Sequence, residues 1–465
     1  TDTPNLVTGL VRENGVSANW VWWAFLLTGM LTVFVFSKIW RRSNLTTDVE
    51  FYEMRYSGKE AAFLRWFRSI YLGVFLNVMI MANVSLAAIK IGGIMLGLQP
   101  WECIVYAAAV TVVFSSLGGL KGVLFTDLLL FVVAMVGAVG AAYFALGHEA
   151  IGGLGGLMET FNSDPELSGK LNFIPEAGTD AFVPFLLIPL LVGWWSTWFP
   201  GAEPGGGGYL AQRMLAAKNE RHAVGATLLF NVCHYALRPW PWIIVALCSL
   251  IVFPDIESIK AAFPNAENVD NDSAYSAMLT FLPAGWMGLV LTSLVAAYMS
   301  TISTHLNWGS SYVVNDVYRR FLKPEATQRE LVWVGRLSTV VLMIMAGIVA
   351  LNMESAQKNF DLLLKIGAGT GSIYILRWFW WRVNAYSEIA GMLIATLNAF
   401  LFWKFDDFGL SGSMPMVASV GITTIGWILM TLITRPTDTA TLRAFAKQTN
   451  PGGPGWQKVY RDAEA

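Results

Sequence analysis

Charge is scarce in this chain, and so are the residues on which most enzymes build their active sites. Asp, Glu, Lys and Arg together make up 14% of the 465 residues, compared with about 25% in an ordinary soluble domain. The formal net charge is −1, which leaves no basic surface for nucleic acid. Three cysteines and four histidines are present. Their spacing forms neither a metal site nor a nucleophile with its base, so we expect no enzyme activity and no nucleic-acid partner.

The sequence is rich in apolar residues. They make up 55% of the sequence, and they form about eleven continuous stretches of roughly 18 residues or more, each long enough to cross a lipid bilayer as a helix. The fold class that this pattern predicts is an all-α polytopic membrane protein. The expected spans lie near 19–40, 68–96, 99–117, 122–146, 181–200, 222–253, 283–312, 331–352, 360–381, 384–403 and 413–434.

The distribution of positive charge predicts the orientation. Most of the Lys and Arg residues fall in connections on one side, which marks that side as cytoplasmic. The two longest connections, near 147–180 and 254–282, are acidic and are expected outside. We therefore expect a transmembrane domain over 1–435 and a cytoplasmic tail over 436–465, in a cell inner (plasma) membrane. The tail contains Pro451-Gly452-Gly453-Pro454-Gly455, which predicts irregular structure.

Hydroxyl side chains are concentrated within the span near 283–312. On a helix, Ala297, Ser300, Thr301 and Thr304 share one face, and Ser303 lies beside Ser300. Hydroxyl and carbonyl oxygens are ligands that a hard cation such as sodium selects. The alternative is that each hydroxyl bonds back to its own helix or allows close helix packing.

A carboxylate begins another span. Asp127 follows Gly118-Gly119-Leu120 and leads into a long apolar run. An ionisable group inside a membrane segment indicates a functional site. A helix cap is an equally good explanation from the spacing alone, because glycines precede Asp127.

The span that ends near residue 200 is broken. Two prolines and five glycines occur between Pro200 and Gly208, and such a stretch cannot continue as a helix. Broken membrane helices are where transporters bind solutes. Trp194, Trp198 and Glu203 are candidate contacts there. An interfacial loop is the alternative, and Glu203 could be paired with Arg213 or Arg238.

With these stretches identified, the chain resembles the sodium:solute symporter family over nearly its full length. The family includes sodium/sugar, sodium/proline and sodium/sialic acid transporters. The resemblance implies a LeuT-like fold of two inverted five-helix repeats with extra C-terminal helices. The segments that carry it are Gly118-Gly119-Leu120 with Thr126-Asp127, Gln212 through Lys218, Ala297 through Asn307, Asp316-Val317-Tyr318 and Gly335-Arg336-Leu337.

The resemblance also implies which residues bind sodium. The main site takes the Ala297 carbonyl and the Ser300 and Thr301 hydroxyls. A second site, as in sialic acid symporters, takes Asp127, Ser300, Ser303 and Thr304. Because all of these side chains are present, we expect two sodium ions.

Other family positions differ or lie outside the chain. Two carbonyls of the main sodium site align just before Thr1, so we expect a missing N-terminal segment that holds most of the first core helix. His234 replaces the lysine of the sugar site, which argues against galactose-like recognition. Tyr209 matches the aromatic residue that closes that site on its inner side. The predicted solute contacts are Trp194, Trp198, Glu203, Tyr209 and His234.

These observations predict a sodium-coupled symporter that takes up a small organic solute. The alternatives are a transport-inactive membrane scaffold and a symporter-like sensor domain. A sensor would be expected to continue into a signalling module.

Overall fold

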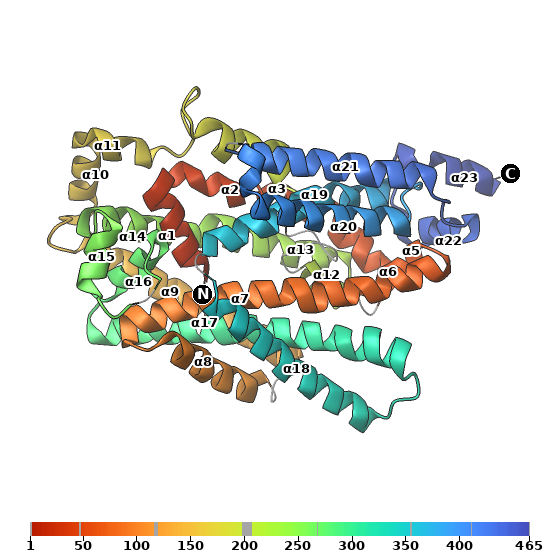
Figure 1. Ribbon diagram of the computed structural model, residues 1–465, viewed down its shortest axis with the longest axis horizontal. Helices are drawn as coiled ribbons and strands as arrows, with labels where there is room; N and C mark the ends of the chain where they lie inside the picture. The colour runs from red at the N-terminus through yellow and green to blue at the C-terminus, as the bar shows by residue number, and fades with distance from the viewer. Residues whose placement is uncertain are drawn as a thin grey trace.

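The computed structural model describes residues 2–45, 48–115, 120–197, 207–266, 268–353, 356–410 and 412–464, and every regular element in these ranges is helical. Eight helical segments among them are long and apolar enough to cross a membrane. Figure 1 shows the longer helices running side by side along the long axis of the molecule. The eight membrane-length segments include α7 (Asn77–Leu96), α9 (Leu120–Leu146), α14 (Pro239–Val252), α17 (Ala284–Ser311), α18 (Gln328–Leu351), α20 (Ala385–Lys404) and α21 (Met414–Ile433), and α19 (Ala356–Phe379) is a further long helix of the bundle.

Eight of the eleven predicted spans coincide with the eight membrane-length segments. The other three predicted spans overlap α8 (Pro100–Ser115), two π-helical turns over Val183–Gly193, and α19. The first predicted span is a composite of shorter pieces that run from Val16 to Ser43. The prediction of an all-α membrane fold is therefore confirmed.

The two long acidic connections lie at one end of the molecule. Their helices α10 (Gly153–Ser163), α11 (Pro165–Ser168) and α15 (Ile256–Ala262) gather there, whereas α5 (Phe51–Arg55), α22 (Thr439–Thr449) and α23 (Gln457–Glu464) lie at the opposite end (Figure 1). The chain enters near the middle of the bundle with α1 (Asp2–Asn14). Residues at the start of α1 therefore lie at mid-depth.

The C-terminal tail is not irregular, and that prediction was wrong. It forms α22 and α23, joined by a short 3-10 turn at Pro454–Trp456. Leu442, Phe445 and Ala446 form one apolar face of α22, and Phe445 and Trp456 are completely buried. These two rings stack on each other with 5.4 Å between centroids, and the Arg55 guanidinium packs against both, 5.3 and 5.0 Å from their centroids. Burial of this face outweighs the turn-forming composition of 451–455.

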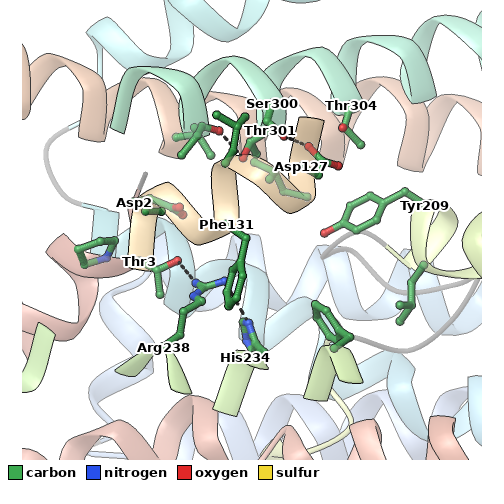
Figure 2. Close-up of a pocket in the computed structure, with 18 of the residues that line it drawn as sticks. Asp2, Thr3, Asp127, Phe131, Tyr209, His234, Arg238, Ser300, Thr301 and Thr304 are labelled. Atoms are coloured by element: carbon green, nitrogen blue, oxygen red, sulfur yellow. Dashed lines mark hydrogen bonds between the residues drawn. The ribbon is translucent and has the colours of Figure 1, made fainter. Parts of the chain in front are cut away.

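Several membrane helices contain π-helical turns, which often mark functional positions. The turn at Val232–Leu237 carries His234 and is followed directly by Pro239 and Pro241 of α14. Proline has no backbone N–H, so the regular hydrogen-bond ladder cannot pass through this point. The interruption brings His234 and Arg238 to the centre of the bundle (Figure 2).

Candidate functional site

The centre of the bundle encloses a cavity of about 670 Å³. Its wall comes from α1, α7, α9, α12 (Gly207–Leu215), α14, α17 and α19. Segments far apart in the sequence thus share one space at mid-depth. Aromatic and aliphatic side chains make up most of the wall, and a small number of polar groups converge on it, which is typical of a small-molecule site.

One wall is the hydroxyl-bearing face of α17. Ala297, Ser300, Thr301 and Thr304 all line the cavity, as the helical spacing predicted. The Thr301 hydroxyl donates to the Ala297 carbonyl at 2.9 Å. This bond is the hydrogen bond to the same helix that the structural alternative expects. It also places the Thr301 and Ala297 oxygens side by side at the cavity surface.

Ser303 does not belong to this face. Its side chain is 1% exposed, it is absent from the cavity wall, and its hydroxyl donates to the Ser300 carbonyl at 3.2 Å. On a helix, a position three residues after Ser300 is rotated about 60° from it, in the direction away from Ala297, Thr301 and Thr304. That rotation is enough to turn Ser303 into the packed interior.

Asp127 faces α17 from the opposite helix. It lies in the third turn of α9, which begins at Leu120, so it does not cap that helix. The Ser300 hydroxyl donates a hydrogen bond to the Asp127 Oδ1 atom (Figure 2). Its Oδ2 atom lies 3.6 Å from the Arg213 Nη2 atom, and both side chains are 30% exposed. The structure therefore joins Asp127 to the α17 hydroxyls and adds a cation that the sequence interpretation had placed elsewhere.

The predicted solute contacts separate into three groups. Tyr209 and His234 line the cavity. Trp194 is absent from its wall; its backbone carbonyl accepts a hydrogen bond from the Thr28 hydroxyl. Trp198 and Glu203 fall outside the described residues.

Arg238 is the main feature that sequence reasoning did not assign to the site. It lines the cavity and donates to His234 Nδ1 at 3.2 Å and to Thr3 Oγ1 at 3.1 Å. Figure 2 shows this group on the opposite side of the cavity from Asp127 and Ser300. An arginine inside a strongly apolar span was the signal that pointed to it.

The available ligand atoms suit a hard monovalent cation better than a transition metal. In the part of the chain that the structure describes, no three His, Cys, Asp or Glu side chains come together as a metal site. The atoms that do meet near α17 are hydroxyl, carbonyl and carboxylate oxygens. Such oxygens coordinate hard cations without the directional nitrogen and sulfur ligands that zinc or copper prefer.

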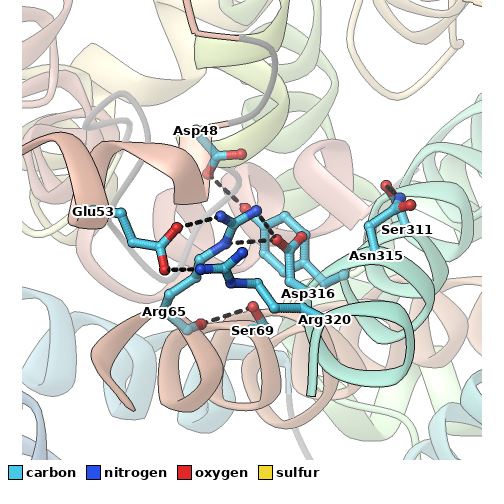
Figure 3. A network of polar contacts seen from close by, with 9 residues as sticks. Asp48, Glu53, Arg65, Ser69, Ser311, Asn315, Asp316 and Arg320 are labelled. Carbon is cyan, nitrogen blue, oxygen red and sulfur yellow. Dashed lines mark hydrogen bonds and ion pairs between the residues drawn. The ribbon is translucent and has the colours of Figure 1, made fainter. Parts of the chain in front are cut away.

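The same long helix carries a second polar group at its far end. There it continues as η10 (Tyr312–Leu322), where Asp316 accepts from the Arg65 Nε atom at 2.8 Å. Arg65 also donates to Glu53 at 2.7 Å, and Glu53 is shared with Arg320 (Figure 3). The Tyr312 hydroxyl donates to Asp48. This set, which we call the end network, closes the space between α6 (Gly58–Ile70) and η10.

A search of known proteins gives a consistent picture. The model of the "Sodium:solute symporter family" matches residues 7–395. Sodium/myo-inositol cotransporter 2 of Oryctolagus cuniculus is 26% identical over 413 residues, which is 81% of this chain and 58% of that protein. The sodium/glucose cotransporter of Vibrio parahaemolyticus is 25% identical over 398 residues, covering 82% of this chain and 71% of that protein.

The fold also has a solved counterpart. A Na⁺-coupled sialic acid symporter, solved in a substrate-bound outward-open state that revealed a novel Na⁺ site, superposes with a TM-score of 0.72. The two sequences are 18% identical, and the match covers 94% of this chain and 87% of the other. This likeness confirms the predicted LeuT-like architecture.

Proposed function

Because the chain belongs to the sodium:solute symporter family, we propose that it couples inward sodium movement to the uptake of a small organic solute across a cell inner membrane. The observation that carries the proposal is the contact between the Asp127 carboxylate and the Ser300 hydroxyl at the edge of the central cavity. The named relatives are sodium cotransporters of small organic solutes, and their cargo is the precedent for coupling.

We propose two sodium ions. One would take the Ala297 carbonyl with the Ser300 and Thr301 hydroxyls. The other would take Asp127 with Ser300, Thr304 and Ser303. The exposure of Ala297, Ser300, Thr301 and Thr304 to one cavity supports this assignment, and the burial of Ser303 makes it the weakest member.

Sodium would act on the solute by tying two walls together. Its ligands lie on α9 and α17, so an ion bound between them favours the state in which these helices are close. A ligand shifts a population only through such differential affinity. Each elementary charge that enters gains about 2.3 kcal/mol per 100 mV of membrane potential, so two ions roughly double the electrical driving force.

The solute would occupy the cavity between Tyr209 and His234. Tyr209 lies against the His305 ring, with 5.6 Å between centroids, and the Arg213 guanidinium lies 5.3 Å above it. A ring held from two sides in this way can form one wall of a closed site. We propose that it separates the solute from the predicted cytoplasmic side, where the C-terminus would lie.

Reconstituted transport tests the proposal. In proteoliposomes with an inward sodium gradient, we expect labelled solute to accumulate, and we expect no accumulation with an equal potassium gradient. Ser300→Ala and Asp127→Ala should weaken the sodium dependence. Thr339→Val on α18, whose hydroxyl bonds only to its own helix at Gly335 O, is the matched control. Sodium activation that is identical in all three variants would contradict the ion assignment.

A further inference from the structure

Arg238 lines the proposed transport cavity, and it makes no direct ion pair with a carboxylate of the described residues. Among the described residues no carboxylate oxygen lies within 4.0 Å of its guanidinium nitrogens. Its two hydrogen-bond acceptors, His234 Nδ1 and Thr3 Oγ1, are neutral. Its third contact is the face of Trp242, 4.9 Å from the ring centroid. The acid whose charge acts on the half-buried guanidinium is Asp2 at the start of α1. Among the described residues, Arg238 therefore has a counter-charge nearby but no carboxylate in contact, whereas buried cations are normally paired directly.

The guanidinium also has unused donors. Arginine has five N–H groups in a planar fork, and the described residues accept from two of its nitrogens. The remaining N–H groups are left for the cavity that the side chain lines. Thr3 adds to them, because a hydroxyl that accepts from Arg238 can still donate its own proton. Donors on two adjacent side chains, from α1 and from the start of α14, therefore converge on one spot.

The two described acidic side chains of the cavity, Asp2 and Asp127, each accept a hydrogen bond from a residue other than Arg238. Asp127 is bonded to Ser300 and lies near Arg213. Asp2 accepts a hydrogen bond from the Asn83 Nδ2 atom on α7 at 3.3 Å. The Arg238 group lies across the cavity from Asp127 (Figure 2). One side of the cavity thus has a carboxylate suited to a cation, and the other has a cation suited to an anion.

We propose that the solute is an organic carboxylate and that Arg238, assisted by Thr3, binds its carboxylate group. This inference rests on the proposed function and names its substrate class. The planar fork of arginine matches a carboxylate with two parallel hydrogen bonds, which a sugar hydroxyl cannot form. Phe25, Phe131, Trp242 and Leu364 also line the cavity, and they provide apolar surface for the rest of the molecule.

Charge balance fits this cargo. Moving a monoanion into a cell that is negative inside costs about 2.3 kcal/mol per 100 mV. One sodium ion would only cancel that cost, whereas two leave a net inward positive charge. A carboxylate solute is therefore a reason for the second sodium site at Asp127.

Matched solute pairs test the proposal by binding to the full-length chain in detergent with sodium present. The pairs are benzoate and benzamide, L-lactate and L-lactamide, and D-glucuronate and D-glucose, and the readout is the concentration that half-saturates thermal stabilisation. We expect at least one carboxylate to bind about tenfold or more tightly than its neutral partner, the ratio expected for a charge-assisted hydrogen bond. Arg238→Gln should remove that preference, and Arg238→Lys should restore part of it.

Two further variants make the test specific. Arg42→Gln removes an arginine that is paired with Glu220 away from the cavity, and it should leave the carboxylate preference in place. Glu203→Gln tests the pairing that the sequence also allows, and it should likewise leave the preference unchanged. Sodium should still stabilise Arg238→Gln, which shows that this variant is folded.

The outcomes separate this inference from the proposed function. Equal binding of neutral and charged partners, binding of no carboxylate, or a preference that survives Arg238→Gln would overturn the inference while sodium still stabilises the protein. A preference lost in Glu203→Gln would also overturn it, because Arg238 would then be paired within the chain. Failure of sodium to stabilise the wild type would instead contradict the proposed function.

Discussion

One continuous helical segment, Ala284–Leu322, carries two polar regions that differ in how completely their groups are paired. At its centre, four residues present hydroxyl and carbonyl oxygens to the cavity: Ala297, Ser300, Thr301 and Thr304. At its far end, Asp316 is 1% exposed and is held by Arg65, which is 12% exposed and also binds Glu53. In the end network Arg65 and Arg320 are paired with Glu53 and Asp316, although the buried Asp316 Oδ2 atom has no hydrogen-bond partner among the described residues. The central face presents several hydroxyl and carbonyl oxygens, and the cation paired with its carboxylate is Arg213.

Within this one helix, the end network has a structural role, and the central face has the proposed ligand-binding role. A paired network stabilises one arrangement of helices and gives a ligand little to gain. A face with spare oxygens and a single carboxylate gains most when a cation arrives. Loss of a partner should therefore destabilise the end network, whereas loss of a ligand at the centre should mainly change sodium affinity.

The largest expected effect is on stability at the end network. Arg65→Met leaves the Asp316 carboxylate buried without its partner, and we expect a loss of about 3–5 kcal/mol in the free energy of unfolding. Chemical denaturation in detergent measures it. The exposed pair Arg42–Glu220, with side chains 37% and 41% exposed, gives the control. Arg42→Gln should cost less than about 1 kcal/mol. If the two variants lose the same free energy of unfolding, the end network is not a structural element distinct from the central face.

The next effect is on sodium affinity. Asp127→Asn keeps the size of the side chain and an oxygen to accept from Ser300, but it removes the charge. We expect the half-saturating sodium concentration to rise about tenfold or more, with stability in saturating sodium near that of the wild type. An affinity that does not change would show that Asp127 is paired with Arg213 for structural reasons only.

A comparison of two hydroxyls sharpens the boundary of the central face. Ser300→Ala should raise the half-saturating sodium concentration by about tenfold, whereas Ser303→Ala should raise it by less than about threefold, since its hydroxyl is bonded to the backbone away from the cavity. Sodium titration of thermal stability compares the two. Equal effects of the two variants would show that Ser303 also binds sodium, which would require α17 to rotate and turn Ser303 toward the cavity.

The smallest effect is on the pH dependence of stability. Burial raises the pKa of the Asp48 carboxyl to about 6, although the hydrogen bond from Tyr312 opposes this. Between the ordinary pKa near 3.8 and about 6, the folded chain binds the extra proton, so Asp48 should lower stability as pH rises through that window. Asp48→Asn should flatten the dependence. Exposed Glu257 provides the control as Glu257→Gln, and melting temperatures at pH 4, 5, 6 and 7 decide the matter.

Much of this organisation could be predicted from the sequence. Long apolar runs determine the spans because a bilayer leaves backbone groups few alternatives to helix. Helical spacing placed Ala297, Ser300, Thr301 and Thr304 on one face, which the structure shows. Spacing could not decide between a cap and an interior position for Asp127, because that depends on where α9 begins.

The remaining features depend on contacts between distant segments. Arg213 lies beside Asp127, and Thr3 lies beside Arg238, across separations that no local pattern encodes. The C-terminal tail is helical because Phe445 and Trp456 are buried against Arg55. The free energy gained by this burial comes from tertiary packing and has no local sequence signal. The burial of Ser303 could not be predicted for a related reason, because a neighbour in sequence can point into the packed interior.

The most direct test of the account is the number of radioactive sodium ions that the purified full-length chain binds. We predict two saturable ions per wild-type chain, one per Asp127→Asn chain, and no competition by potassium. The same count in both proteins, or competition by potassium at equal concentration, would contradict a sodium site made by Asp127 and the α17 hydroxyls.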